Sequence, residues 1–311
     1  MNIEGQVIMR YGLEEKAKQI NRDAIKKGLP TVRLIPRVAG DGVLGIENQV
    51  KQFYSLIKKK VDLIIVQPTD NAALTAPLKL ANKKNIPVVS YDQFILGGKQ
   101  VSFITSNNYQ AGKLNAEYIA SKFKNNYEIK LVLVEYPNVS STIDRVDGFF
   151  DTLKKLNQKY KIIGTYKAVE PTSGIKAGGD ILRDFPKKGS IDVIFTINDG
   201  GGLSIVDALS KAGRNEIMIA TVDGDPLSVK NIKDKNLTVI DSAQFCAELG
   251  RQSILAAYSF LNGKKVSNKI LVPSYPITNE TIKNYSGWKA KIPPPFKKPW
   301  FPYDDWDNSI K

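Results

Sequence analysis

The sequence contains no histidine and only one cysteine, Cys246, among its 311 residues. Histidine is the commonest general base and the commonest metal ligand in proteins, so its absence disfavours many kinds of enzyme site. A single cysteine can form neither an internal disulfide nor a cysteine-rich zinc site. No base partner for Cys246 is evident, so we expect a small buried residue rather than a nucleophile. We expect no metal ion and no cofactor.

The sequence also lacks a run of about 18 apolar residues, so it predicts no membrane-spanning helix. Its first residues, MNIEG, lack the basic and apolar segments of a secretory signal. Two interpretations stay open. The protein is cytoplasmic, or it is extracytoplasmic and its signal or anchor segment is absent from this sequence.

The sequence has fewer acidic residues than basic ones. It contains 31 Asp and Glu residues and 45 Lys and Arg residues, which give a formal charge of +14. Such an excess is typical of proteins that bind nucleic acid. Here the basic residues are spread along the chain, and no basic arm or helix-turn-helix segment precedes the core. A solvated surface is therefore the better interpretation, and an anionic membrane or cell wall is a second one. We expect no nucleic-acid partner.

Strand and helix signals alternate along most of the chain. The segment VDLIIV at 61–66 is a β-branched apolar run, typical of a strand buried on both faces of a parallel sheet. A helical pattern at 74–82 and a second strand at 86–91 follow, and similar pairs continue to about residue 261. Repeated β-α-β units predict parallel sheets with right-handed crossovers. The number of predicted strands is larger than a single domain of this kind normally holds, so we predict an α/β protein with two doubly wound lobes.

The two ends of the chain differ from this pattern. The first 50 residues predict helices at 13–27 and 47–59, a strand at 31–35 and a loop at 37–45. Only QVIM at 6–9 is available for the strand that normally opens such a lobe, so that strand is absent, short or supplied differently. Residues 286–311 hold all three tryptophans and five prolines. Because of the prolines we expect no regular structure there, and the aromatic residues favour packing on a lobe, with contact to a partner protein as the alternative.

Polar side chains follow five of the predicted strands, and in parallel sheets ligands bind outside the carboxyl ends of strands. The segments are 67–70, 92–93, 106–108, 198–199 and 223–225. Carboxylates accept hydrogen bonds from hydroxyl groups, and an asparagine amide both donates and accepts, so such a ring suits a neutral polyol. Each residue alone is also explained as a helix cap. The repetition at five strand ends favours a binding site.

Other features leave alternatives open. Arg145 could clamp a ring oxygen, a hydroxyl or an acid group with its rigid fork of donors, or it could form a surface ion pair with Asp144 or Asp147. The run Gly200–Gly202 is no phosphate-binding loop, because no Lys-Ser/Thr follows and the spacing of a dinucleotide fingerprint is missing. A pair of glycosidase carboxylates is compatible with the spacing, but catalytic acids favour apolar pockets and these aspartates lie among Asn and Gly.

Seven segments occur in an order that is familiar from one family. They are VDLIIVQPTDNAAL (61–74), IPVVSYDQ (86–93), ITSNNYQAG (104–112), RVDGF (145–149), IDVIFTIND (191–199), LSKAG (209–213) and IATVDGDP (219–226). With them the chain resembles the type I periplasmic binding proteins for ribose, galactose and xylose, from about residue 45 to 265. The resemblance implies two lobes joined by three crossovers, with the ligand between them.

The resemblance also implies where each part of the chain lies. Residues 1–107 and 245–272 would form the first lobe, residues 108–244 and 273–285 the second, and residues 286–311 a tail packed on a lobe. Polar ligand contacts are implied at seven positions, and Gln93 stands where many members carry Arg or Lys. The candidate ligand-binding residues are Gln67, Asp92, Gln93, Asn108, Arg145, Asn198, Asp223 and Gln244.

Our first hypothesis is an extracytoplasmic protein that closes around a monosaccharide or similar polyol and delivers it to an ABC permease, without catalysis. The second is a ligand-sensing subunit docked on a membrane sensor kinase or chemoreceptor. An enzyme is disfavoured, and a cytoplasmic regulator would need a DNA-binding headpiece that this sequence lacks. We expect a monomer unless the protein sits in a receptor complex, and the sequence leaves the particular sugar open.

Overall fold

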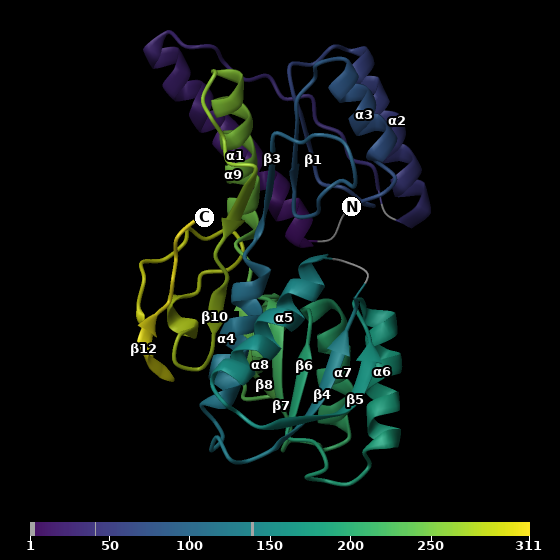
Figure 1. The fold of residues 1–311 in the computed structure, drawn as a ribbon, viewed down its shortest axis with the longest axis vertical. Helices are drawn as coiled ribbons and strands as arrows, with labels where there is room; N and C mark the ends of the chain where they lie inside the picture. The colour runs from purple at the N-terminus through teal and green to yellow at the C-terminus, as the bar shows by residue number, and fades with distance from the viewer. Residues whose placement is uncertain (1–3, 41, 138–139) are drawn as a thin grey trace.

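The computed structural model describes residues 4–40, 42–137 and 140–311. Two α/β lobes follow one another along the long axis of the molecule, and each is built around its own sheet (Figure 1). The prediction of two doubly wound lobes is therefore confirmed. Within the described ranges, no helix combines the length and apolar character needed to cross a membrane.

The first lobe has a four-stranded parallel sheet. Its strands, in spatial order, are β1 (Ile64–Val66), β2 (Val88–Tyr91), β3 (Ser102–Ser106) and β9 (Lys269–Val272). The helices are α1 (Glu4–Lys27), α2 (Gly42–Lys58), α3 (Thr75–Lys83) and α9 (Cys246–Leu261). Ile64 and Val66 pack with Phe53 of α2 and Leu78 of α3 on one face. The other face of β1 carries Ile65, which packs towards α1 and α9, so the sheet is covered on both sides.

The second lobe has a six-stranded sheet. Its strands, in spatial order, are β10 (Tyr275–Ile277), β8 (Thr238–Ala243), β7 (Met218–Asp223), β6 (Val193–Thr196), β4 (Ile129–Glu135) and β5 (Tyr160–Lys167). Only the β10–β8 pair is antiparallel. The helices are α4 (Asn108–Ala120), α5 (Ser140–Lys155), α6 (Pro171–Asp184), α7 (Asp199–Lys211) and α8 (Pro226–Lys233).

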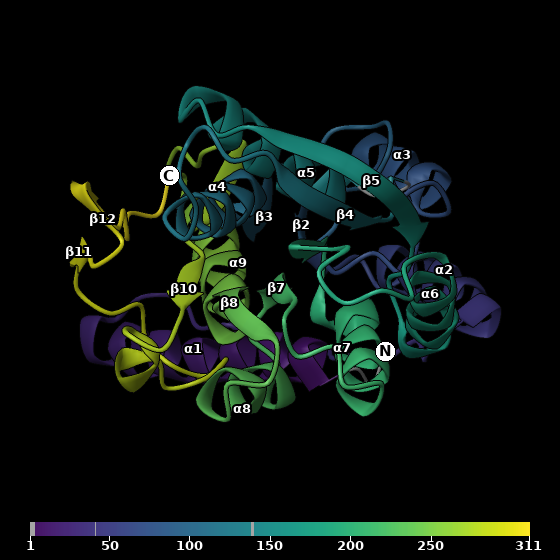
Figure 2. The ribbon, with the colours of Figure 1, turned by 90° about the horizontal axis from the view of Figure 1, so that it is seen from below.

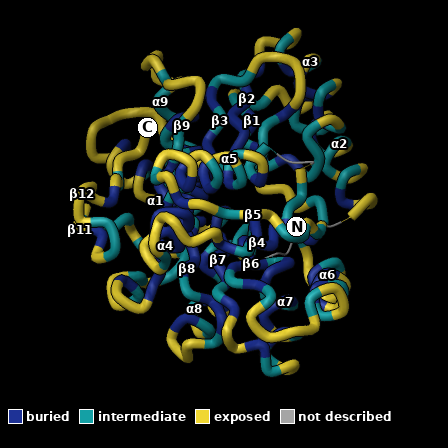
Figure 3. The backbone as a smooth tube through the Cα atoms, turned by 60° about the horizontal axis from the view of Figure 1, so that its bottom comes forward, coloured by how far each residue is buried: buried dark blue, intermediate teal, exposed yellow. Residues whose placement is uncertain are grey.

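Alternation along β4 shows why the second lobe has two layers of helices. Leu131 and Leu133 pack with Phe149 of α5, whereas Val132 and Val134 pack with residues of α6 and α7. Successive side chains of a strand point to opposite faces, so an unbroken apolar run is buried on both sides. Figure 3 shows the central strands as mostly buried and the outer faces of the helices as exposed.

Three crossovers join the lobes, at the β3–α4, β8–α9 and β9–β10 junctions. The hydroxyl of Ser106 on the first crossover donates to Oε1 of Gln244 on the second (2.8 Å). The N–H of Ser274 on the third crossover donates to Oε1 of Gln110 in α4 (2.9 Å). These bonds tie the three segments together. The residue boundaries of the lobes given above stay a prediction, with β9 lying in one sheet and β10 in the other.

The N-terminal segment differs from the sequence-based expectation. Residues 6–9 lie inside α1, and residues 31–35 form no strand. The predicted strand at 31–35 is therefore wrong, because the described chain places no strand beside it to complete a ladder. No strand precedes α1 in the described residues, and β1 lies at the edge of its sheet.

The C-terminal tail corrects a second expectation. Instead of lacking regular structure, it contains a short antiparallel pair, β11 (Lys297–Lys298) and β12 (Phe301–Asp305). The prolines do not prevent this pairing because a two-stranded ladder at the surface tolerates missing donors. The tail lies along β10 and α4, on the side of the molecule away from α2 and α6 (Figure 2).

Candidate functional site

Seven of the eight candidate residues lie at or close to the carboxyl ends of strands that face the junction between the lobes, and the eighth, Arg145, lies in α5. Gln67 follows β1, Asp92 and Gln93 follow β2, and Gln244 follows β8. Asp223 is the last residue of β7 and Asn198 follows β6 closely, while Asn108 and Arg145 lie in α4 and α5. Parallel strands end at one edge of a sheet, so this local pattern brings residues far apart in sequence to one region.

Arg145 is the centre of the polar groups on the second lobe. Its Nε donates to Oδ1 of Asn108 (2.9 Å), and its Nη1 donates to the carbonyl oxygen of Ile197 (2.6 Å). The same Nη1 lies 3.1 Å from Oδ1 of Asp223, which also accepts from Nε2 of Gln244 (2.6 Å). Nη2 of Arg145 donates to no group in the described part of the chain. A buried, fixed guanidinium with donors left over is suited to an oxygen-rich ligand.

The first lobe contributes a second carboxylate. Nε2 of Gln67 donates to Oδ2 of Asp92 (2.8 Å), which fixes that carboxylate beside the crossovers. Asp92 and Asp223 both have a positive φ, 64° and 134°. Residues other than glycine rarely adopt such angles, and backbone strain of this kind concentrates at ligand-binding sites. The fold therefore holds both candidate carboxylates in unfavourable backbone conformations.

Burial controls the electrostatics of these two carboxylates. Loss of solvent raises the pKa of Asp92, and the hydrogen bond from Gln67 and the charge of Arg145 oppose the shift. Burial likewise raises the pKa of Asp223, and Arg145 and Gln244 oppose it. A desolvated carboxylate gains from every donor that it acquires. Hydroxyl groups of a ligand would supply such donors without adding charge.

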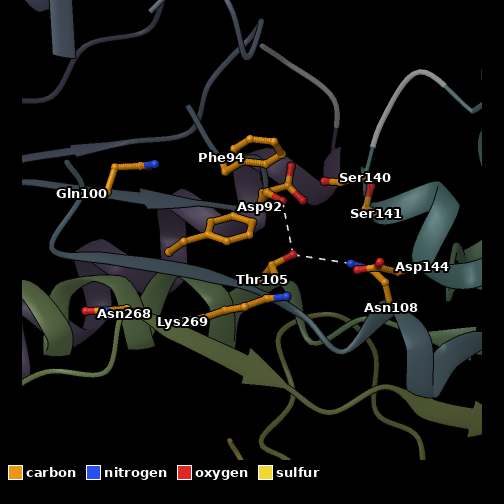
Figure 4. Close-up of a pocket in the computed structure, with 11 residues that line it drawn as sticks. Asp92, Phe94, Gln100, Thr105, Asn108, Ser140, Ser141, Asp144, Asn268 and Lys269 are labelled. Atoms are coloured by element: carbon orange, nitrogen blue, oxygen red, sulfur yellow. Dashed lines mark hydrogen bonds between the residues drawn. The ribbon is translucent and has the colours of Figure 1, made fainter. Parts of the chain in front are cut away.

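A cavity of about 410 Å³ adjoins Asp92, whereas Arg145 and Asp223 are not among its lining residues (Figure 4). Asp92 and Asn108 line it, and Thr105 connects them through bonds to the carbonyl oxygen of Asp92 (3.2 Å) and from Nδ2 of Asn108 (3.5 Å). The rings of Phe94 and Phe103 form an edge-to-face pair with centroids 6.0 Å apart and also line this space. The cavity thus combines polar groups with an aromatic surface, as small-molecule sites do.

Two candidate residues, Asn198 and Gln93, differ from the others in their hydrogen bonding. Asn198 is the N-cap of α7, where its Oδ1 accepts from the N–H of Gly201 (3.2 Å) and its Nδ2 donates to the carbonyl oxygen of Val169 (2.8 Å). These bonds already account for its amide in a structural role. Gln93 is half-buried, and its Oε1 is buried without a hydrogen-bond partner in the described residues. A contact between either residue and a ligand stays a prediction.

Sequence reasoning missed several residues near this region. Phe94 and Phe103 were not among the candidates, although Phe94 lies only two residues after Asp92. A second omission is the pairing of Asp199, which lies in the segment 198–199 but was not a candidate, with Asp241. Burial raises the pKa values of both aspartates, that of Asp241 to about 7. Only the three-dimensional structure brings these two aspartates together, since 42 residue positions separate them in the chain.

The described residues give little support for a nucleophilic cysteine or a metal site. Cys246 is buried, and burial raises the pKa of its thiol, which keeps it protonated. Among residues 4–40, 42–137 and 140–311, no three Cys, Asp or Glu side chains come together as metal ligands would. The arrangement of donors, acceptors and rings therefore supports reversible binding.

Comparisons with known proteins agree with one another. Residues 2–265 match the family model described as the periplasmic binding protein domain. The ribose import binding protein of Bacillus subtilis (strain 168) is 27% identical over 257 residues, covering 82% of this chain and 79% of that protein.

Solved structures show the same fold. An ABC transporter periplasmic solute binding protein from Actinobacillus succinogenes 130z with bound D-allose has a TM-score of 0.74 at 23% identity, covering 92% of this chain and 96% of that one. An ABC transporter solute binding protein from Bacillus halodurans C-125 with bound myo-inositol has a TM-score of 0.73 at 21% identity, covering 91% and 93%.

Proposed function

The chain belongs to the family of the periplasmic binding protein domain, and from that premise we propose that it binds a neutral monosaccharide or a similar polyol between its lobes. One observation carries the proposal. Arg145, Asp223 and Gln244 form a fixed set of donors and acceptors, and Asp92 from the other lobe lies close enough for its pKa to respond to Arg145 and Asp223.

The chemistry of these groups matches a polyol better than an ion. Each hydroxyl of a sugar both donates and accepts a hydrogen bond, and the site offers carboxylates as acceptors and guanidinium and amide N–H groups as donors. Phe94 and Phe103 offer apolar faces for the C–H side of a sugar ring. Ribose, D-allose and myo-inositol are among the ligands that the names of similar proteins state, which supports this ligand class.

Binding would be completed by movement of the lobes about the three crossovers. The ligand contacts Asp92 and Gln67 from the first lobe and Arg145 and Asp223 from the second. Closure brings these groups together around it. Closure also excludes water, which strengthens every hydrogen bond in the site.

The closed form would then be presented to a membrane partner outside the cytoplasm. Delivery to an ABC permease is the first proposal, supported by the transporter role named for similar proteins. Docking of the monomer on a sensor kinase or chemoreceptor is the alternative. Loss of sugar uptake on deletion of the gene supports transport, whereas normal uptake together with a stable complex with a sensor ectodomain supports signalling.

A thermal-shift screen tests the ligand class. A ligand that binds only the folded state at about 100 times its Kd stabilises that state by ~2.7 kcal/mol. The panel contains D-ribose, D-allose, D-galactose, D-xylose and myo-inositol, with glycine as a non-sugar control. We expect the Tm to rise by several degrees with at least one polyol. Shifts with none of them would contradict the proposal.

A further inference from the structure

The backbone turn that carries Asp223 has an unusual conformation. Asp223 has a φ of 134°, and Gly224 after it has a φ of 81°. A Cβ on Gly224 would lie 2.5 Å from the Cβ of Ala243, so a side chain at this position would collide with β8. Backbone strain of this kind persists only where the surrounding structure holds it in place. The contacts around residues 223–225 therefore decide where the carboxylate of Asp223 lies.

The second lobe holds the N–H groups of this turn. The N–H of Gly224 donates to both carboxylate oxygens of Asp241 in β8 (3.0 and 3.1 Å). The N–H of Asp225 donates to Oδ2 of Asp199 at the start of α7 (2.8 Å). Both acceptor residues are buried. These bonds satisfy two backbone donors and anchor the turn to its own lobe.

The carbonyl oxygen of Asp223 has two donors outside β7. One is the N–H of Gln244 on the second crossover (3.0 Å). The other is Nε1 of Trp288 in the C-terminal tail (2.7 Å). Trp288 lies beyond residues 2–265, the part of the chain that matches the family model. A side chain outside the matched domain therefore bonds directly to the backbone of a candidate ligand-binding residue.

The backbone around Trp288 is bonded to the first lobe. Its carbonyl oxygen accepts from the N–H of Ala247 in the first turn of α9 (3.0 Å). The carbonyl oxygen of the next residue, Lys289, accepts from Nη2 of Arg251 in the same helix (3.3 Å). The ammonium group of Lys289 lies 5.0 Å from the centre of the Tyr11 ring in α1. The indole of Trp288 thus bonds to the second lobe, while the backbone beside it bonds to the first.

This bridge between the lobes runs beside the second crossover. The crossover joins β8 to α9 through residues 244–245, and Trp288 bonds to residues on both sides of it. Rotation of the lobes about the crossovers changes the relation between α9 and β7, so it also acts on a bridge that is bonded to both. A shift of the Asp223 carbonyl oxygen moves the carboxylate of the same residue, which pairs with Arg145 and Gln244.

We propose that Trp288 is a positioning residue for the sugar site. Its indole N–H fixes the backbone of Asp223, and its attachment to α9 makes the place of the Asp223 carboxylate depend on the first lobe. Trp288 acts through Asp223 and need not touch the ligand. The expected effect on sugar affinity rests on the proposed function, whereas the effect on the turn at residues 223–225 is independent of any ligand.

A matched pair of variants tests the role of this indole. Trp288→Phe removes the N–H donor and keeps an aromatic ring. Trp300→Phe is the control, because Trp300 is also a half-buried residue of the tail, and its Nε1 has no hydrogen-bond partner in the described residues. Equal losses in the two variants would report the loss of ring area alone.

The first measurement is amide hydrogen exchange without sugar. We expect the amides of Gly224 and Gln244 to exchange roughly fivefold faster in Trp288→Phe, the factor that a typical hydrogen bond contributes. Both amides should exchange at the wild-type rate in Trp300→Phe. The amides of residues 131–133 in β4 report global opening of the second lobe, and they should exchange equally in all three proteins.

The second measurement is sugar binding. For each polyol that raises the Tm, we expect the Kd to increase by roughly fivefold or more in Trp288→Phe and to keep its wild-type value in Trp300→Phe. We also expect sugar to change the tryptophan fluorescence of the wild type, because closure acts on the bridge at Trp288. This change should be largely lost in Trp288→Phe and kept in Trp300→Phe.

The exchange measurement is independent of the sugar measurement. A wild-type protein that binds no polyol contradicts the proposed sugar function, and the exchange rates at Gly224 and Gln244 still decide whether Trp288 positions the turn. Equal exchange in Trp288→Phe and Trp300→Phe overturns the positioning role, whether or not sugar binds. Where sugar binds, an unchanged Kd in Trp288→Phe also overturns it, since the contact would then only stabilise the fold.

Discussion

The guanidinium of Arg145 and the carboxylate of Asp223 form an ion pair with 3.1 Å between Nη1 and Oδ1, at the edge of the second lobe that faces the first. Arg145 is buried, so its charge depends on this partner and on the carbonyl oxygen of Ile197. Removing one member of a buried, hydrogen-bonded charge pair typically costs 2–5 kcal/mol or more. Loss of either member would therefore leave the other charge without its partner, and the pair presets the donors for a ligand.

The first prediction concerns the planar guanidinium group of Arg145. Arg145→Lys keeps the charge but loses the planar donors that contact Asn108 and Ile197. We expect sugar affinity to fall by roughly 30-fold or more, equivalent to ~2 kcal/mol, as measured by isothermal titration calorimetry. Arg183→Lys, on the exposed side of α6, is the control and should bind as the wild type does. Equal sugar affinity in the two variants would mean that Arg145 does not belong to the binding site.

The second prediction concerns the helix pair that positions Arg145. A Cβ on Gly112 of α4 would lie 1.9 Å from the carbonyl oxygen of Arg145, so Gly112→Ala must push α4 and α5 apart. Overpacking of this kind costs about 1–3 kcal/mol, and displacement of Arg145 should weaken sugar binding as well. Gly179→Ala is the control, because nothing lies within 4 Å of its added Cβ. That variant should be as stable as the wild type or gain up to ~1 kcal/mol.

The third prediction concerns pH. Burial, with the charge of Asp223, raises the pKa of Asp241 to about 7, whereas an unfolded aspartate titrates near pH 4. Between these values the folded state holds a proton that the unfolded state has lost, so stability falls as the pH rises from about 4 to 7.

Asp241→Asn should remove the part of that slope that comes from Asp241, whereas Asp199, whose pKa burial also raises, keeps its own part. An asparagine keeps an acceptor for the N–H of Gly224 and brings no charge. We expect the Tm at pH 8 to rise by about 2–4 °C, equivalent to ~1 kcal/mol, with little change at pH 4. Asp305→Asn, at an exposed position, serves as the control. A wild-type Tm that is flat from pH 4 to 7 would contradict the prediction.

The fourth prediction concerns the tail. Trp306 is only 1% exposed, and its Nε1 donates to the carbonyl oxygen of Ser274 on the third crossover (2.8 Å). Trp306→Ala should lower the free energy of unfolding by about 3–5 kcal/mol, measured by urea denaturation. Tyr303 is 89% exposed, so Tyr303→Ala should change it by less than about 0.5 kcal/mol. Similar losses in both would mean that the tail is not packed as described.

Much of this arrangement was predictable from sequence because it follows from local rules. Buried strands are unbroken apolar runs, and the polar residues directly after them must meet at one edge of a parallel sheet. This logic located Asp92 and Asp223. The match to the periplasmic binding protein domain confirms the family resemblance, and with it the expectation that the chain is a binding protein and not an enzyme.

What sequence could not supply depends on tertiary structure. Phe103 sits within a strand, and nothing local shows that its ring faces a cavity. The residues 31–35 have the composition of a strand, but a strand needs a neighbour, and the described chain provides none. In the tail, the prolines suggested irregular structure, while the pairing of Lys298 with Phe301 depends on the fold around it.

The most direct measurement is a calorimetric titration of the wild type, Asp92→Ala and Asp223→Ala with each polyol that shifts the Tm. Binding between the lobes predicts a one-to-one complex for the wild type and no measurable binding for either variant, while circular dichroism shows that both variants stay folded. Wild-type affinity in both folded variants would mean that the ligand binds elsewhere.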